Sequence, residues 1–389
     1  MSNVNYGLRF ESSGDSISAE PKLREVSDRS PVVPSSSVQE LTPYEAVTSQ
    51  AAIRAKPDGE TVFKLDWNES TVPASPEVRE AIAAHIAGDR GLNWYPQLGS
   101  EELIEALTDY TGLESENLLV TNGSDDALHL ICDTFLDPGD HVVAPAPTYN
   151  HFITFAQSCG ADIEKPIGES PFEKSIDAIR DSLRPSTRIL YLVSPNNPTG
   201  VIYPPEDVAE LCRDHPETLI LLDEAYYEFA KVTGVDLVEE HPNIVVTRTF
   251  SKAFGLAGLR VGYLSGHPEL VDALSRIYNP KSVNTLGQVG AKAALEDLEY
   301  LEEYLSEVEA AKGVLADYLD TTPVEYHMTP ANFVVVRVPQ LQETLDALEQ
   351  RGIYVRDRSD YPGLDNCLRM TIGTVDQTRK VIDLISGVF

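Results

Sequence analysis

From about residue 58 onward, short runs of hydrophobic and β-branched residues alternate with amphipathic stretches. This alternation is typical of βαβ units, which build a largely parallel sheet. The hydrophobic runs predict strands at Leu118–Thr121, His141–Ala144, Ile189–Val193, Leu219–Leu222, Ile244–Thr247 and Leu259–Leu264. The pattern therefore indicates an α/β fold whose main sheet is doubly wound and mostly parallel.

Helix-start signals stand between these predicted strands. Ser75 precedes Pro76, and a capping hydroxyl followed by proline in the first turn is a typical helix start, so we predict a helix over Pro76–Ala87. A second helix is predicted over Asp125–Leu136, with Ser124 as its cap.

The C-terminal part of the chain combines helices and strands in a different way. A helical stretch at 285–318 is followed by predicted strands at Phe333–Val338, Ile353–Arg356 and Cys367–Ile372, with helices between and after them. We interpret this part as a smaller α+β domain, with the ligand cleft between the two domains. The predicted division is a flexible, serine-rich extension at 1–38, an N-terminal arm or small-domain segment at 39–57, a large domain at 58–282 and a small domain at 283–389.

The charge and composition of the chain exclude some classes of binding partner. The 62 acidic and 30 basic residues give a net charge of −32, which repels phosphate backbones and anionic membrane surfaces, and no basic stripe offsets it. No hydrophobic run approaches the roughly 18 residues of a membrane span. The four cysteines are scattered without metal-ligand spacing. We therefore expect small-molecule ligands, a reducing, cytoplasmic location and no metal, while the excess of surface carboxylates raises the hypothesis of a high-salt source.

The segment RTFSKAFGLAGLRVGY at 248–263 carries the most informative chemistry. Lys252 follows a hydrophobic strand and precedes a glycine-rich stretch, where its amine could form a Schiff base with a carbonyl cofactor. Thr249, Ser251 and Arg260 could contact a phosphate. The alternative is that the segment is only a solvated turn.

Three further segments follow predicted strands. In LLDEAYYE, Asp223 could hold the proton of a pyridine-type nitrogen, while Glu224 is expected to be structural or solvent-facing, because adjacent residues of a strand face opposite ways. In SPNNPTG, Asn197 could donate to a phenolate oxygen, although an ordinary turn would have the same sequence. TNGSDDAL presents free N–H groups to an anion at a helix start. All these groups are expected to meet at the carboxyl edge of one sheet.

Four segments resemble, in the same order, motifs of the fold-type I, pyridoxal-phosphate-dependent aminotransferases, and within them the histidinol-phosphate aminotransferases. They are SPNNPTG, DEAYYEF, RTFSKAFGLAGLRVGY and GIYVRDRSDYPGLDNCLRMTIGT, and the similarity covers about 41–389. The resemblance implies a fold-type I transferase with a seven-stranded type of sheet, pyridoxal 5′-phosphate as cofactor and a homodimer. It also implies a ping-pong transfer of an amino group between glutamate and histidinol phosphate, with 2-oxoglutarate as the oxo acid.

The resemblance also assigns roles to individual residues. Lys252 would bind the cofactor and carry a proton between the substrate Cα and the cofactor C4′, and Asp223 would hold the pyridinium proton. Tyr226 and Asn197 would bond the phenolic oxygen. The other cofactor contacts implied are Tyr149 on the ring face, the N–H groups of Ser124 and Asp125, the side chains of Thr249, Ser251 and Arg260, and Tyr95 from the neighbouring subunit.

For the substrate, Arg369 resembles the arginine that binds the α-carboxylate. Arg356 resembles the arginine for the substrate phosphate, and Tyr44 the tyrosine that closes over it. A surface ion pair with Asp357 is the alternative for Arg356.

The chain departs from the family at two places near the substrate entrance. Asn68-Glu69 lacks the usual Asn-Pro continuation, and NWYP replaces Arg-Tyr-Pro. An aromatic amino acid aminotransferase and a phosphoamino-acid decarboxylase therefore remain alternatives, and a catalytically idle regulator would lack Lys252. His85, His129 and His151 have no metal-ligand spacing and are expected to be packed or surface side chains.

Overall fold

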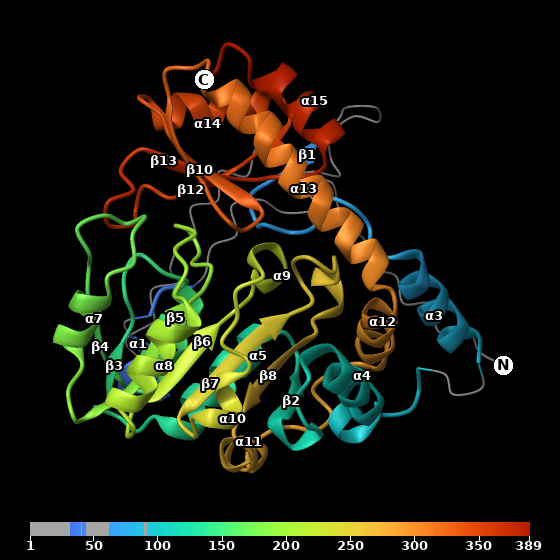
Figure 1. Cartoon of the computed structure of the whole chain (residues 1–389), viewed down its shortest axis with the longest axis vertical. Helices are drawn as coiled ribbons and strands as arrows, with labels where there is room; N and C mark the ends of the chain where they lie inside the picture. The colour runs from blue at the N-terminus through green and yellow to red at the C-terminus, as the bar shows by residue number, and fades with distance from the viewer. Residues whose placement is uncertain (1–31, 40, 44–61, 89–91) are drawn as a thin grey trace.

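The structure is a computed structural model that describes residues 32–39, 41–43, 62–88 and 92–389. A large α/β domain lies below a smaller α+β domain in the view of Figure 1, and the long helix α13 (Leu298–Leu319) runs down one side from the smaller domain toward the larger. In this described part of the chain, none of the helices combines the length and the hydrophobicity needed to cross a membrane.

The sheet of the large domain has seven strands in the order β2-β8-β7-β6-β5-β3-β4. Six strands are parallel to one another, and β8 runs antiparallel to its neighbours β2 and β7. The strands are β2 (Leu118–Thr121), β3 (His141–Val143), β4 (Asp162–Glu164), β5 (Thr187–Val193), β6 (Leu219–Asp223), β7 (Ile244–Thr249) and β8 (Gly262–Gly266). The predicted fold class, a mostly parallel seven-stranded sheet plus a smaller α+β domain, is confirmed.

Two strands of this large sheet differ most from the prediction, and in the small domain the strand predicted at Ile353–Arg356 is divided between two sheets. β4 was not predicted, because Asp162–Glu164 is short and lacks a hydrophobic run. The strand predicted at Leu259–Leu264 begins only at Gly262, because Ala257–Leu259 forms a 3-10 turn and Arg260 takes the left-handed conformation at φ +55°. The hydrophobic run alone could not distinguish this turn from a strand.

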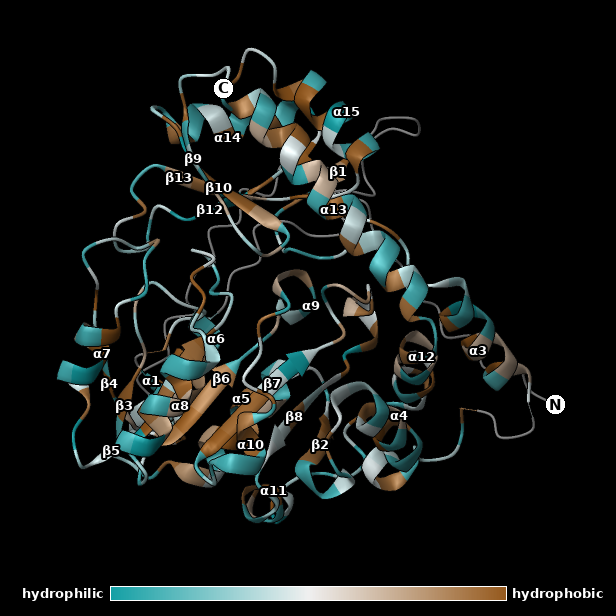
Figure 2. Cartoon of the chain, viewed as in Figure 1, coloured by the Kyte–Doolittle hydropathy of each residue, from teal (hydrophilic) through white to brown (hydrophobic). Residues whose placement is uncertain are grey.

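Alternate residues of the strands face two separate cores. Leu190, Leu192, Ile220 and Leu222 lie in the core that is covered by helices α4, α8 and α12. Tyr191 and its alternating neighbours lie in the opposite core, which is covered by α5, α6 and α11. Figure 2 shows the hydrophobic character of β6, near the centre of the sheet. The covering helices are α4 (Glu101–Thr111), α5 (Ser124–Phe135), α6 (Asn150–Ser158), α8 (Pro205–Asp214), α11 (Pro268–Ser275) and α12 (Thr285–Glu296).

The predicted helix starts have different outcomes. α3 (Pro76–Ala87) has its predicted bounds, and Ser75 Oγ accepts a hydrogen bond from Glu77 N at 3.1 Å. In α5, however, Ser124 is the first helical residue rather than the cap, because Gly123 at φ +86° turns the chain from β2 into the helix. The remaining short helices of the described residues are α1 (Ser36–Gln39), α7 (Ile176–Ser182), α9 (Tyr227–Ala230) and α10 (Leu237–Glu240), with 3-10 turns at Leu98–Ser100 and Ser115–Asn117.

The small domain is built on a four-stranded antiparallel sheet in the order β12-β13-β10-β9. A separate parallel pair joins β1 (Phe63–Lys64) to β11 (Ile353–Tyr354). Helices α13, α14 (Leu341–Gln350) and α15 (Val375–Ile385) contribute to its core. The sheet strands are β9 (Glu325–Met328), β10 (Phe333–Arg337), β12 (Arg356–Asp357) and β13 (Cys367–Thr371).

Three segments have contacts that cross the predicted domain boundaries. β1 lies within the range predicted for the large domain, but it pairs with β11 of the small domain. α12 lies within the predicted small domain, but it packs against α3 and α4. α1 lies across the boundary predicted at residue 38 and contacts α6. The helical stretch predicted at 285–318 is two helices, because Asp297 interrupts it and accepts a hydrogen bond from Ser75 Oγ.

Candidate active site

A cavity of about 530 Å³ lies at the carboxyl edge of the large sheet, where the small domain adjoins it. Its lining comes from the ends of β2, β5, β6 and β7 and from β12 and β13. The predicted site residues that line it are Ser124, Asp125, Tyr149, Asn197, Asp223, Tyr226, Thr249, Ser251, Lys252, Arg260, Arg356 and Arg369. The predicted convergence of these segments is therefore confirmed.

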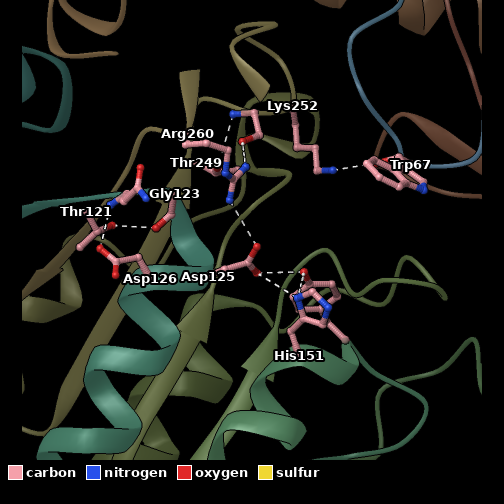
Figure 3. A network of polar contacts seen from close by, with 12 residues as sticks. Trp67, Thr121, Gly123, Asp125, Asp126, His151, Thr249, Lys252 and Arg260 are labelled. Carbon is pink, nitrogen blue, oxygen red and sulfur yellow. Dashed lines mark hydrogen bonds and ion pairs between the residues drawn. The ribbon is translucent and has the colours of Figure 1, made fainter. Parts of the chain in front are cut away.

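One end of the cavity is a cup of donors at the start of α5. Arg260 Nη1 donates to Ser251 Oγ at 3.3 Å, and its Nη2 lies 3.4 Å from Asp125 Oδ2 (Figure 3). Ser251 N donates to Thr249 Oγ1 at 3.1 Å, which fixes the two hydroxyl residues relative to each other. The first N–H groups of a helix have no partners within the helix, so Ser124 and Asp125 add backbone donors here. This set of donors suits a phosphate.

Two glycines keep the cup open. A Cβ on Gly262 would lie 2.6 Å from Ser124 N, and one on Gly123 would lie 2.5 Å from Arg260 Nη2. Both distances are shorter than real Cβ atoms show, so a side chain at either position would displace the groups that form the cup.

The Asp125 side chain has a function that the sequence did not reveal. Tyr149 Oη donates to Asp125 Oδ1 at 2.9 Å and lies 3.1 Å from His151 Nδ1. Although burial opposes it, hydrogen bonds from His151 and Tyr149, together with the Arg260 charge, hold the pKa of Asp125 below its ordinary value. His151 was expected to be a packed or surface residue. Its ring does pack against Tyr149 and Phe155, but His151 also lines the cavity, a position that the expectation did not include.

Asp223 lies in the cavity wall at the end of β6. Tyr191 Oη donates to its Oδ2 at 2.9 Å, and Ala225 N donates to its Oδ1 at 3.2 Å. Burial raises the pKa of Asp223 to about 6, although these hydrogen bonds lower it. The neighbouring Glu224 faces away and forms a buried ion pair with Arg248 at 2.9 Å. Of the two alternatives for Glu224, the structural one is confirmed.

The Lys252 amine lies in the same cavity, just after β7. Its Nζ donates to the carbonyl of Trp67 at 2.8 Å, so the amine is held by a neutral acceptor rather than a carboxylate (Figure 3). Tyr226 Oη accepts a hydrogen bond from Asn68 Nδ2 at 3.0 Å, which gives Asn68 a contact within the site. Asn197 Oδ1 accepts from Arg369 Nη1 at 2.5 Å.

The cavity thus offers a donor cup, a buried carboxylate and an amine. Pyridoxal 5′-phosphate has an anion that suits the cup, a ring nitrogen that would pair with Asp223 and a carbonyl that can react with Lys252. The raised pKa of Asp223 supports this fit, because a buried carboxylate is stabilised by a cationic partner. The residues present therefore fit the cofactor.

Three arginines gather at the small-domain side of the cavity. Arg369 is buried, and its guanidinium donates to Asn197 and to the carbonyl of Asp66. Arg356 lies directly opposite Arg369 in the pairing of β12 with β13. Arg358, which the sequence prediction left out, also lines the cavity. Asp357, the alternative partner considered for Arg356, accepts hydrogen bonds from Ser359 instead.

Two predicted residues do not join this cavity. Tyr95 is 81% exposed and lines a different pocket together with Trp94, and Lys281 Nζ lies 5.0 Å from the centre of its ring. Its predicted contact with a neighbouring subunit's cofactor therefore stays a prediction. Tyr44 lies outside the described residues.

Comparison with known proteins identifies the family. A family model for aminotransferases of class I and II matches residues 60–385. The chain is 35% identical over 354 residues to a dihydroxyacetone phosphate transaminase from Campylobacter jejuni, a match that covers 90% of this chain and 95% of the relative. It is 35% identical over 333 residues to a histidinol-phosphate aminotransferase from Methanococcoides burtonii, which covers 84% of this chain and 90% of the relative.

A solved structure agrees with these matches. Histidinol-phosphate aminotransferase from Sinorhizobium meliloti, in complex with pyridoxal-5′-phosphate, has a TM-score of 0.82 and 25% identity to this chain, and the match covers 93% of this chain and 98% of that one. The family model, the relatives and this fold agree over most of the chain. The chain therefore belongs to the class I and II aminotransferases and is a transaminase that uses pyridoxal phosphate.

Proposed function

We propose that this transaminase acts on histidinol phosphate, with 2-oxoglutarate and glutamate as the oxo acid and amino acid pair, in histidine biosynthesis. The observation that carries the proposal is the arginine cluster in the cavity wall. Arg369 alone would suffice for an α-carboxylate, since one guanidinium binds a carboxylate with two parallel hydrogen bonds. Additional guanidinium groups in the same cavity favour a substrate with a second, more highly charged anion.

The residues around the cofactor support amino transfer. When bound, pyridoxal phosphate supplies an electron sink for the negative charge that develops at the substrate Cα. Lys252 would move the proton from the substrate Cα, and its neutral hydrogen-bond partner, the Trp67 carbonyl, leaves the amine available. Asp223 would hold a proton at the ring nitrogen, and Arg369 would orient the α-carboxylate.

A second candidate is transamination of a small phosphorylated ketone. The relative from Campylobacter jejuni, named a dihydroxyacetone phosphate transaminase, favours it. This candidate shares the need for a phosphate site, so the arginine cluster is compatible with both. An aromatic amino acid substrate has no second anion and would leave these charges without a partner.

A comparison of substrates tests the proposal. The purified enzyme, loaded with pyridoxal phosphate, is assayed with 2-oxoglutarate and either histidinol phosphate or phenylalanine as amino donor. A parallel assay pairs glutamate with dihydroxyacetone phosphate. We expect the largest kcat/KM with histidinol phosphate. A larger value with dihydroxyacetone phosphate would select the second candidate, and a larger value with phenylalanine would contradict a phosphate site.

The proposal includes a homodimer in the cytoplasm. The exposed hydrophobic side chains Leu92, Trp94, Tyr95 and Leu98 support a subunit contact, since they cluster in one short segment. The four free cysteines are compatible with a reducing compartment. Sedimentation of the active enzyme as a monomer would contradict the dimer.

A further inference from the structure

Arg358 is a charged residue of the cavity to which the sequence analysis gave no role and which the proposed function counts only as part of the arginine cluster. It lines the same wall as Arg356 and Arg369. Its Nε is buried, and among the residues that the structure describes it has no hydrogen-bond partner. A buried, unsatisfied donor on a charged group is costly, so its presence in a ligand cavity calls for a physical reason.

The local backbone explains why Arg358 faces the cavity. Residues two apart on a strand point to the same side, so Arg358 follows Arg356 while Asp357 points away. Arg358 N donates to the carbonyl of Cys367 at 2.9 Å, which continues the pairing of β12 with β13 by one residue. The guanidinium carbon lies 5.4 Å from the centre of the Tyr361 ring, which supports it from one side.

The charges of this wall oppose one another. Arg356 and Arg369 are directly opposite across two antiparallel strands, an arrangement that is destabilising for like charges. Burial, followed by the charge of Arg358, lowers the pKa of Arg369 to about 9. Burial also lowers the pKa of Arg358, and the Arg356 charge adds to this effect. Three guanidinium groups in one wall of the cavity favour a bound anion.

We propose that Arg358 acts with Arg356 to bind the phosphate of the substrate, and that this pair determines selectivity for phosphate monoesters over carboxylates. A phosphate monoester carries nearly two negative charges and three terminal oxygens, so it can accept from two guanidinium groups at once. A carboxylate has one charge and is satisfied by one guanidinium. The inference rests on the proposed function only for the identity of the amino substrate. The binding of a phosphate monoester is argued from the arginines themselves.

The first experiment measures what the substrate phosphate contributes. The kcat/KM for histidinol phosphate is divided by that for histidinol, in the wild type and in Arg358→Gln, Arg358→Lys and Arg379→Gln. Arg379 is exposed on α15, so its variant makes the same charge change outside the cavity. We expect Arg358→Gln to lower the ratio by about 10- to 100-fold, the range for a lost charge-assisted hydrogen bond. Arg358→Lys should recover part of the loss, and Arg379→Gln should leave the ratio unchanged.

A second measurement separates this inference from the proposed function. Glycerol 3-phosphate has a phosphate monoester but no amine, so its inhibition of the glutamate half-reaction reports phosphate binding alone. Arg358→Gln should raise its inhibition constant about 10-fold or more, even if histidinol phosphate is not a substrate. An inhibition constant within threefold of the wild-type value, or no inhibition of the wild type, would overturn the role of Arg358. Equal losses for histidinol and histidinol phosphate in the first experiment would also overturn it, because they indicate a structural role.

Discussion

The two ends of the cavity differ in how their charges are balanced. At the cofactor end, Arg260 pairs with Asp125, and the Asp125 carboxylate also accepts from Tyr149. At the substrate end, Arg358 and Arg369 each have a buried Nε without a hydrogen-bond partner among the described residues. The first end is a network of satisfied polar groups, whereas the second concentrates positive charge.

This difference follows from what each end binds. A cofactor remains through many turnovers, so a site whose side chains already hold each other in place loses little order when it binds. A substrate anion enters and leaves in each cycle, and buried guanidinium N–H groups that lack a hydrogen-bond partner among the described residues, such as Nε of Arg358 and Arg369, are available to it. We therefore expect single substitutions at the cofactor end to be partly compensated by neighbours. At the substrate end, no neighbouring group should compensate for a single substitution, so its whole effect should appear in the binding of the substrate.

Lys252 is the exception at the cofactor end, because no neighbour can replace its amine. We expect Lys252→Ala to lower kcat by at least about 10⁴-fold, since it removes both the covalent contact to the cofactor and the proton carrier. Steady-state turnover with glutamate and 2-oxoglutarate measures the loss. The variant should still bind pyridoxal phosphate by equilibrium dialysis, because Asp223, Arg260 and Ser251 remain. Turnover within 100-fold of the wild type would remove Lys252 from the reaction.

Arg356→Ala should produce the next largest effect. Loss of a charge-assisted contact to phosphate in a closed site costs about 2–4 kcal/mol, which is roughly 30- to 1000-fold in kcat/KM. Histidinol phosphate should show this loss. Glutamate should be weakened to a smaller extent if its distal carboxylate uses the same group, and phenylalanine should be nearly unaffected.

Steady-state kinetics with the three amino donors checks this order. If histidinol phosphate stays within about threefold of its wild-type kcat/KM in Arg356→Ala, the substrate end does not hold a phosphate, and the comparison between the two ends fails.

Asp223 provides a pH test of the cofactor end. Burial raises its pKa to about 6 from 3.8, so in this pH range the folded state keeps a proton that the unfolded state releases. Without cofactor, the contribution of Asp223 to stability is therefore fully present below pH 3.8 and is lost as the pH rises through 6, by about 3 kcal/mol in all. Asp223→Asn should lack this loss. Urea unfolding of the cofactor-free proteins at pH 4 and pH 7 measures the difference.

Two controls sharpen the Asp223 result. The exposed Asp383→Asn should follow the wild type at both pH values. At pH 7 without cofactor, Asp223→Asn should be more stable than the wild type. Added pyridoxal phosphate should reverse this order, because a pyridinium proton favours the ionised carboxylate of Asp223. Parallel pH curves for wild type and Asp223→Asn without cofactor would show that this carboxylate is not desolvated.

Most of the fold and the cofactor end could be predicted from the sequence because their signals are local. Hydrophobic runs marked the central strands, and Lys252, Asp223 and Asn197 each follow one of them. The pairing of β1 with β11 could not be predicted, because each strand has only two residues and its partner lies far away along the chain. The turn at Arg260 was missed because the hydrophobic run that contains it does not distinguish a left-handed turn from a strand.

The two site residues that the sequence prediction missed, Arg358 and His151, also differ in whether the sequence carries a local signal for them. Arg358 had a local signal, since the two-residue period of a strand places it on the same side as Arg356. His151 had none. Its role depends on the contacts with Tyr149 Oη and Asp125, which come together because α5 and α6 pack against each other on the same face of the sheet.

His151 gives the smallest predicted effect and tests compensation directly. In His151→Ala, Tyr149 Oη keeps its hydrogen bond to Asp125, and Asp125 keeps its ion pair with Arg260. The variant should therefore lose about one hydrogen bond, or 0.5–1.5 kcal/mol, and bind pyridoxal phosphate roughly 3- to 10-fold more weakly. Fluorescence titration of the cofactor-free protein measures this affinity, with His129→Ala as the control because His129 pairs with Asp133 away from the cavity. A loss above 100-fold would mean that the cofactor end depends on each contact as strongly as the substrate end does. The contrast between the hydrogen-bonded network at the cofactor end and the arginine cluster at the substrate end would then no longer hold.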